Sequence, residues 1–259
     1  MGGRRVLIFA LAFGVACTAA GPERSPSPAG PIRVLVFSGA EGFRHTSIDA
    51  AVERFRRIAR DGEIAFTFTD DAAALTHDAF AAHDVLVWNN ATGETPLGRA
   101  QKDAMIAAVR EDGLGFVGIH AAADSNYRWR AFVGLVGASF DSHPHASGRA
   151  RLTIEDPANP LVQGVPDPWV VDEELYRWRR DPRGRVHVLV SLDASSIRER
   201  EEYARAHPLI WCHEPGRGRA FYTNLGHAEE TFDDPVYIGM LVRAIRWASG
   251  RIEADCSLD

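Results

Sequence analysis

The chain has 259 residues, 46% hydrophobic and 25% charged, which is typical of a globular protein and excludes the disordered, collagen-like and coiled-coil classes. Its 29 basic and 35 acidic residues give a net charge of −6 without a basic patch or a charged tail, so we expect no nucleic-acid partner. Lys102 is the only lysine, and Cys17, Cys212 and Cys256 are the only cysteines. This scarcity argues against a disulfide scaffold and a cysteine-rich zinc site. Ten histidines are the main reactive residues.

Residues 1–16 have the layout of a secretory signal peptide, in which a basic pair precedes an apolar stretch from Val6 to Val15. The small residues before Cys17 resemble the lipobox of bacterial lipoproteins, where the cysteine is lipidated; ordinary cleavage beside an incidental cysteine is the alternative. Residues 17–30 are rich in Pro, Ser and Gly and predict a flexible tether. We therefore expect an exported protein, periplasmic or on the outer cell surface, that contacts a membrane only through a lipid anchor at Cys17.

Residues 31–251 form one predicted domain, and residues 252–259 form a C-terminal tail. In its first half, continuous apolar runs alternate with segments of helical periodicity, which predicts a doubly wound sheet of mainly parallel strands. The strands expected there are Ile32–Ser38, Ile64–Phe68, Asp84–Asn90 and Gly115–His120, with helices near Ile48–Ala59 and Pro96–Glu111.

From Gly148 onward, strand patterns dominate and predict a β-rich extension of the same sheet. The fold class expected is therefore α/β, with a doubly wound, mostly parallel sheet and this C-terminal extension. The candidate strands are Arg151–Ile154, Trp169–Trp178, Val186–Leu192, Leu209–His213 and Ala220–Asn224, and a final helix covers Pro235–Ser249.

Three histidines follow predicted strands whose carboxyl ends share one edge of the sheet. His45 lies in the loop after the first strand, and His120 and His227 follow two later strands. In doubly wound folds, ligands bind beyond the carboxyl ends of the strands. Asn89 and Asp124 also follow strands and are candidate substrate-binding residues, as is His45. The loop before His45 lacks the glycine spacing and the lysine of a Walker loop, so we expect no nucleotide.

A short polar segment, Asp141–His145, contains two more histidines. If this segment is extended, His143 and His145 point to the same side, as a metal-binding pair does. The proline between them makes a turn equally compatible with the sequence, and an ordinary polar loop is then the simpler interpretation.

An acidic segment begins at Asp172. Strand alternation would send Glu174 and Tyr176 to the same face as Asp172, where carboxylates could serve acid–base chemistry or bind substrate. For Glu173 we expect a solvated strand face. Aromatic residues that could offer an apolar face to a ligand are Tyr127 and Trp129, and Trp178 with Tyr176.

Five motifs, spread over nearly the whole domain, are recognisable together: Gly42–Ile48, Gly115–Ala122, Leu135–Pro144, Asp172–Tyr176 and Gly218–His227. In this order they resemble the ThuA-like (trehalose utilisation) family, and agreement across separate motifs is far more specific than any single one. The resemblance implies a class I glutamine amidotransferase-like fold, a flavodoxin-like sheet and a role in bacterial sugar and keto-sugar metabolism.

The wider superfamily implies roles for particular residues. Glutamine amidotransferases have a Gly-x-Cys-x-Gly strand end, whose cysteine is the nucleophile, and a late His-x-Glu that completes a triad. The resemblance places His120 at the position of the cysteine and gives His227 and Glu229 the other two positions. Because there is no thiol to form a thioester, we expect no glutaminase activity. His120, His227 and Glu229 are instead candidates for proton transfer or metal binding.

The expected function is action on a carbohydrate or keto-sugar by isomerisation, elimination or hydrolysis, carried out by an enzyme without a cysteine nucleophile. A neutral imidazole can move the proton next to a sugar carbonyl at neutral pH. A divalent metal, zinc or a similar ion, could be held by His143 and His145 together with His120 or His227 and polarise the sugar.

Two alternatives to this function remain open. A non-catalytic carbohydrate-binding or accessory protein would use the same crevice, and a flavodoxin-type redox partner would bind flavin, although we expect no flavin. If the substrate is a keto-sugar, a sugar dehydrogenase is a functional partner, because it would produce the oxidised sugar.

Overall fold

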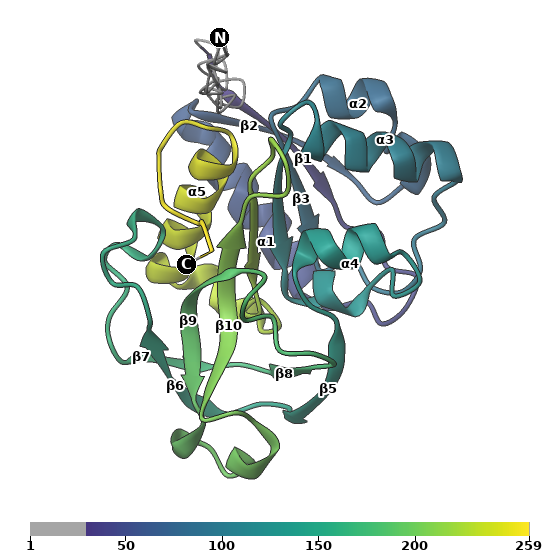
Figure 1. Cartoon of the computed structure of the whole chain (residues 1–259). Coiled ribbons are helices and arrows are strands. Elements are labelled where there is room, and N and C mark those ends of the chain that lie inside the picture. The colour runs from purple at the N-terminus through teal and green to yellow at the C-terminus, as the bar shows by residue number, and fades with distance from the viewer. Residues whose placement is uncertain (1–29, 259) are drawn as a thin grey trace, which may run out of the picture.

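The computed structural model describes residues 30–258, so the expected signal peptide, nearly all of the tether and Cys17 lie outside the described residues. Within this part of the chain, a nine-stranded sheet forms the centre of the molecule, in the order β2-β1-β3-β4-β11-β10-β9-β6-β7 (Figure 1). The expected fold class is confirmed: a doubly wound, mostly parallel half is continued by a β-rich extension of the same sheet.

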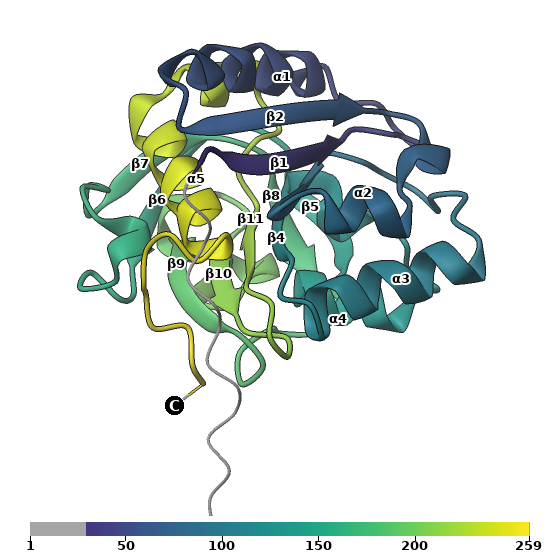
Figure 2. The same cartoon turned by 90° about the horizontal axis from the view of Figure 1, so that it is seen from above.

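The parallel half contains five strands with helices on both faces. Its strands are apolar and mostly buried because both faces of the sheet are covered, by α1 and α5 on one side and by α2, α3 and α4 on the other (Figure 2). The strands are β1 (Ile32–Phe37), β2 (Ile64–Thr69), β3 (Val85–Asn89), β4 (Gly115–Ile119) and β11 (Ala220–Thr223). The helices are α1 (Ser47–Ile58), α2 (His77–Ala81), α3 (Arg99–Arg110), α4 (Arg130–Val136) and α5 (Pro235–Ala248).

The extension consists of four strands that pair antiparallel beyond β11. Two further strands form a separate small sheet that packs beside the ends of the parallel strands (Figure 1). The extension contains β10 (Ala206–His213), β9 (His187–Asp193), β6 (Arg149–Ile154) and β7 (Trp169–Asp172), and the small sheet contains β5 (Phe140–His145) and β8 (Leu175–Trp178).

The single strand expected at Trp169–Trp178 is wrong. The chain leaves the main sheet after β7 and enters the small sheet at β8, so Glu173 and Glu174 form the link between two different sheets. Strand alternation does not extend through such a link, and both side chains are buried. The solvated position expected for Glu173 is therefore also wrong, since only 2% of this residue is exposed.

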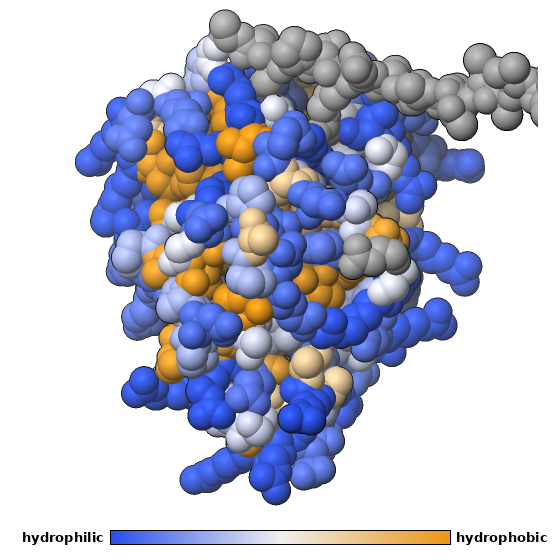
Figure 3. Space-filling view, turned by 60° about the vertical axis from the view of Figure 1, so that its left-hand side comes forward, coloured by the Kyte–Doolittle hydropathy of each residue, from blue (hydrophilic) through white to orange (hydrophobic). Residues whose placement is uncertain are grey.

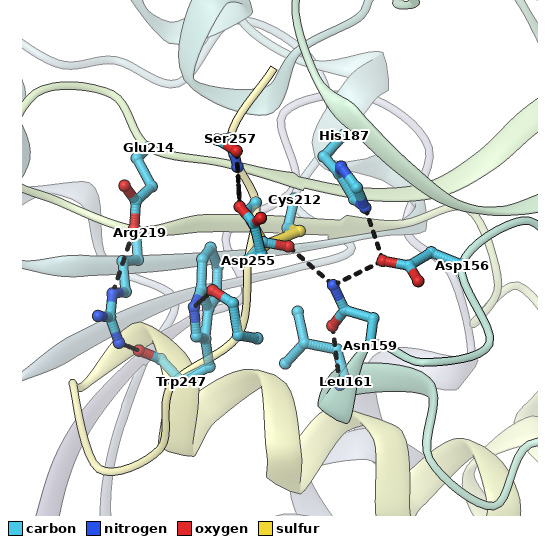
Figure 4. The surroundings of a disulfide bond; sticks show 12 residues. Asp156, Asn159, Leu161, His187, Cys212, Glu214, Arg219, Trp247, Asp255 and Ser257 are labelled. Carbon is cyan, nitrogen blue, oxygen red and sulfur yellow. Dashed lines mark hydrogen bonds and ion pairs between the residues drawn. A yellow bond between two sulfur atoms is a disulfide. The ribbon is translucent and has the colours of Figure 1, made fainter. Parts of the chain in front are cut away.

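The described part of the C-terminal tail is bound tightly to the domain, and a disulfide joins Cys212 on β10 to Cys256 (Figure 4). The buried Arg219 donates hydrogen bonds to the Ile252 carbonyl and to the Trp247 carbonyl at the end of α5. The Asn159 side chain donates to the Asp255 carbonyl at 2.7 Å. The small number of cysteines argued against a disulfide scaffold. No pattern in the sequence indicates this single bridge, whose two cysteines lie 44 residues apart.

The surface of the described chain is mainly polar. Large hydrophobic residues that are exposed are limited to Phe43, Val170 and Leu258 among residues 30–258. The face that Figure 3 presents is largely hydrophilic, with hydrophobic residues in scattered patches between charged ones. Across the same residues, we find no helix with the length and apolar character needed to cross a membrane.

Candidate functional site

Three histidines from distant parts of the sequence meet at the carboxyl ends of parallel strands. His45 lies between β1 and α1, His120 follows β4, and His227 follows β11. The ring centroid of His45 lies 5.0 Å from that of His120 and 5.2 Å from that of His227, and the last two rings are 5.2 Å apart. Parallel strands end at one edge of the sheet, which is why the three rings lie together.

Glu174 completes this group from the link between β7 and β8. Its Oε1 lies 3.4 Å from His120 Nε2 and 3.6 Å from His227 Nδ1. One potential ligand atom from each of His45, His120, Glu174 and His227 lies within 4.8 Å of the other three. We call these four residues the histidine cluster.

The backbone at His120 has the sharp bend of a nucleophile elbow. Its φ of 42° is in the left-handed region, which non-glycine residues rarely adopt. Tyr222 Oη donates a hydrogen bond to the His120 carbonyl at 2.8 Å and supports the bend. His120 Nδ1 donates to the Asn224 carbonyl at 2.6 Å. In a neutral ring this bond fixes the tautomer, so that Nε2 presents its lone pair to the cluster.

The facing nitrogen atoms of the cluster have no hydrogen-bond donor. His45 Nδ1, His120 Nε2 and His227 Nδ1 are buried and make no hydrogen bond within the described chain. An unsatisfied buried polar group costs about 1–3 kcal/mol, so three together are a substantial penalty. A single proton between His120 and Glu174 would leave the nitrogen atoms of His45 and His227 unpaired. One cation at the centre of the cluster would satisfy all four groups.

The electrostatics of the cluster favour neutral imidazoles and an ionised carboxylate. Burial, followed by the proximity of His120 and His227, lowers the pKa of His45 to about 3. Burial and His120 also lower the pKa of His227. Burial acts to raise the pKa of Glu174, but the surrounding histidines outweigh this effect and lower it. At neutral pH, His45 and His227 are therefore neutral and Glu174 carries a negative charge.

These donors fit a divalent transition metal. Imidazole nitrogen and carboxylate oxygen are ligands for zinc and similar ions, at about 2.0–2.2 Å from the metal. In a tetrahedral site, such ligand atoms lie about 3.4 Å from one another. The distances from Glu174 Oε1 to His120 Nε2 and His227 Nδ1, 3.4 and 3.6 Å, are already close to this value, and the other ligand atoms, which lie within 4.8 Å of one another, would have to move closer together.

Two buried polar residues hold the loops that carry the histidines. Asn90 donates from its side-chain amide to the Gly226 carbonyl and the Ser47 hydroxyl, and its Oδ1 accepts from the backbone N–H of Ala121. These bonds connect the loops that follow β1, β3, β4 and β11. The Glu173 carboxylate accepts hydrogen bonds from the backbone N–H groups of Gly226 and His227 and from the Thr231 hydroxyl.

The cluster is accessible from the side of His227 and His143. The side chain of His227 is 34% exposed and that of His143 is 47% exposed, whereas the His120 side chain is fully buried. His143 Nδ1 lies 3.6 Å from Glu174 Oε2, the oxygen that faces away from His120. Asp124 lies near the same group and receives a hydrogen bond from Tyr127 Oη; burial raises the pKa of Asp124.

His143 and His145 have different partners in the structure, and His145 is not part of the histidine cluster. The β5–β8 pairing is irregular between Ser142 and His145, so the alternation expected for an extended segment is interrupted. His145 instead uses both ring nitrogens, with Nδ1 2.9 Å from Glu199 and Nε2 3.1 Å from the Gly148 carbonyl.

Several other sequence candidates lie outside the cluster. Glu229 is exposed on the short helix Glu229–Asp233, and the cluster's carboxylate comes from Glu174 instead. Asn89 is buried and donates to Ser38 and to the Ile48 carbonyl. The ring of Trp129 stacks on Phe132, with Lys102 above it, and the buried ring of Tyr176 packs against His120 at 4.3 Å.

Sequence analysis missed three residues of this region. Phe43 is 68% exposed, and its ring meets that of His45 edge-on at 4.9 Å. Its place in a glycine-containing loop after a strand could have indicated a residue of the site. Asn90 and Glu173 act through bonds to distant loops, and no local pattern indicates such contacts.

We expect Glu173→Gln to destabilise the metal-free protein by about 1–3 kcal/mol, because an amide NH₂ would face the backbone donors of Gly226 and His227. The matched variant Glu174→Gln should have a smaller effect, since Glu174 accepts no backbone hydrogen bond from residues 30–258. Denaturant unfolding in the presence of a chelator measures both. Equal free energies of unfolding for the two variants would contradict this role of Glu173.

Comparisons with known proteins agree with this architecture. A ThuA-like protein from Bacteroides uniformis has 25% sequence identity and a TM-score of 0.71, with 86% of this chain and 94% of that chain covered. A ThuA-like protein from Parabacteroides merdae has 20% identity and a TM-score of 0.66, with 88% and 98% covered. No curated protein matches the chain. The ThuA family model, described as trehalose utilisation, matches residues 33–248, and the chain therefore belongs to the ThuA family.

Proposed function

We propose that this protein binds a divalent metal, zinc or a similar ion, at the histidine cluster and acts on a carbohydrate or keto-sugar there. The observation that carries the proposal is the set of three buried, unpaired ring nitrogens that face the Glu174 carboxylate. The family description, trehalose utilisation, supports a carbohydrate as the substrate class.

A metal in this position would supply Lewis-acid polarisation of a sugar carbonyl or hydroxyl. The side chains then have distinct tasks. His45, His120 and His227 supply nitrogen ligands, and Glu174 supplies Oε1. His143 stands at the open side with its ring near Glu174 Oε2, which can orient the imidazole. His143 is thus placed to move the proton next to a carbonyl, as isomerisation, elimination or hydrolysis of a keto-sugar requires.

The open side also offers groups that suit a sugar. The exposed ring of Phe43, next to His45, provides an apolar face for the C–H side of a sugar ring. Asp124, which already accepts from Tyr127, can accept a further hydrogen bond from a sugar hydroxyl. The cluster, the aromatic ring and the carboxylate would together bind and orient the substrate.

We expect the purified full-length protein to bind one equivalent of a divalent metal per chain. His45→Ala, His120→Ala and Glu174→Gln should each weaken binding at least about 100-fold, because each removes a ligand. Elemental analysis and titration of the chelator-treated protein with Zn²⁺ and Mn²⁺ measure this. A metal concentration of about 1,000 times Kd should also raise the free energy of unfolding by about 4 kcal/mol.

A matched control is His77→Ala, since His77 lies exposed on α2, away from the cluster. This variant should bind metal as the wild type does. Failure of the wild-type protein to bind any divalent ion, or unchanged affinity in all three cluster variants, would contradict the metal site.

We expect the metal-loaded protein to convert at least one compound in a panel of oxidised and unoxidised glycosides. His143→Gln should lower kcat about 10²- to 10⁴-fold, the usual contribution of a general acid or base, while metal content stays unchanged. Product analysis by NMR, which follows deuterium exchange next to the carbonyl, measures the reaction. Binding of a glycoside without turnover by any form of the protein would favour a carbohydrate-binding accessory role instead.

We also propose that the protein is exported and lipid-anchored at Cys17. The N-terminal sequence motivates this proposal, and the buried Cys212–Cys256 disulfide supports it, because disulfides persist mainly in oxidising compartments outside the cytosol. An extracytoplasmic location would place the protein where it meets external sugars.

Cell fractionation of a bacterial host tests the anchor. We expect the wild type in the membrane fraction and Cys17→Ser released or retained as an uncleaved precursor, because only a cysteine thiol is lipidated. A wild-type protein that is soluble in the periplasm would show ordinary signal-peptide cleavage, and a cytoplasmic one would overturn export.

A further inference from the structure

A pocket lined by four arginines lies next to the proposed site. It has a volume of about 460 Å³, and no acidic residue lines it. This composition is unusual in a chain with a net charge of −6. We call this feature the arginine pocket, and its lining residues are Tyr127, Arg130, Val133, Ala138, Ser139, Arg179, Arg180 and Arg185.

These arginines differ from most others in the protein. Arg33, Arg177 and Arg183, for example, each form ion pairs with carboxylates at 2.5–2.8 Å. Within residues 30–258, by contrast, no carboxylate oxygen lies within 4.0 Å of the guanidinium groups in the arginine pocket. Arg179 acts electrostatically on Asp141, and Arg185 donates a hydrogen bond to the Asp181 carbonyl at 3.0 Å. Neither contact is an ion pair, so the positive charge of the pocket remains available for an anion from solution.

Arg179 is held in a defined orientation. Its Nε donates a hydrogen bond to the Phe140 carbonyl at 3.0 Å, and its guanidinium lies over the ring of Tyr127, 4.5 Å from the centroid. These two contacts restrict the side chain. The N–H groups of the terminal nitrogen atoms Nη1 and Nη2 can still donate hydrogen bonds. A planar guanidinium held in this way suits two parallel hydrogen bonds to a carboxylate, sulfate or phosphate.

Two sets of contacts connect the arginine pocket to the histidine cluster. Tyr127, which lines the pocket, donates its hydroxyl hydrogen bond to Asp124, and Asp124 interacts electrostatically with His120 and His143. Phe140, whose carbonyl holds Arg179, stacks its ring on His143 at 5.7 Å. The pocket and the open side of the cluster are therefore neighbours, connected by Tyr127 and Phe140.

We propose that the arginine pocket binds the oxyanion group of an acidic carbohydrate, a carboxylate, sulfate or phosphate, whose reacting sugar lies at the histidine cluster. This assignment rests on the proposed function for the reacting sugar, but the anion site itself does not depend on a metal or on turnover. The arginines, one of which lies over the ring of Tyr127, would then favour negatively charged substrates over neutral ones.

Calorimetric titration of the full-length, chelator-treated protein tests the proposal, because without metal an anion cannot bind as a metal ligand. The probes are glucose, glucuronate, glucose 6-sulfate and glucose 6-phosphate, with inorganic sulfate and phosphate as free anions. We expect at least one acidic sugar to bind about 10-fold or more tightly than glucose. The sugar that binds most tightly identifies the oxyanion, and tighter binding of a free anion than of every acidic sugar would overturn the sugar assignment.

The variant Arg179→Gln/Arg180→Gln should abolish this preference, and the matched control Arg60→Gln, an exposed arginine outside the pocket, should keep it. Circular dichroism verifies that both variants are folded. Equal binding of neutral and acidic sugars, or a preference that survives the double substitution, would overturn the proposal. Either result would leave metal binding by the cluster intact, and loss of metal binding would leave the anion site intact.

Discussion

The structure around the site depends on one unfavourable juxtaposition, in which three imidazole nitrogens without a hydrogen-bond partner and one carboxylate oxygen face one another in a buried space. Such groups are poorly solvated and unpaired, so they stay together only if the surrounding protein holds them or a cation lies between them. Here the protein does hold them. His120 is fixed by its bond to the Asn224 carbonyl, and the Glu173 carboxylate accepts hydrogen bonds from the backbone N–H groups of Gly226 and His227.

This arrangement explains why buried polar residues lie at the ends of the parallel strands. Asn90 connects three loops whose strands are far apart in sequence, and Ser47 donates to the same Gly226 carbonyl that Asn90 binds. Gly226 itself has a φ of 116°, and a Cβ there would lie 2.8 Å from the Ile119 side chain. A side chain at this position would displace the loop that carries His227, so the backbone geometry, as well as the side chains of the cluster, is specific to the site.

Much of the fold followed from sequence because its parallel strands are continuous apolar runs, which only a sheet covered on both faces produces. The meeting of His45, His120 and His227 followed from the same logic, since each comes after such a strand. Glu174 was a candidate for the wrong physical reason. Its position depends on where the chain changes from the main sheet to the small sheet, and strand alternation cannot report such a change. The bridge between Cys212 and Cys256 similarly depends on the path of the C-terminal tail, which carries no periodic signal.

The elbow at His120 shows how one backbone geometry can serve different chemistries. A side chain on a sharp turn after a parallel strand projects to the point where neighbouring strands end, and a cysteine there resembles the nucleophile of glutamine amidotransferases. A histidine in the same position has two nitrogens, and in this protein the first is already bonded to the Asn224 carbonyl. The second points at Glu174 and not at the exposed side of the cluster. We therefore infer that His120 is better suited to hold a metal than to transfer protons, and that proton transfer belongs to His143, whose ring reaches the solvent.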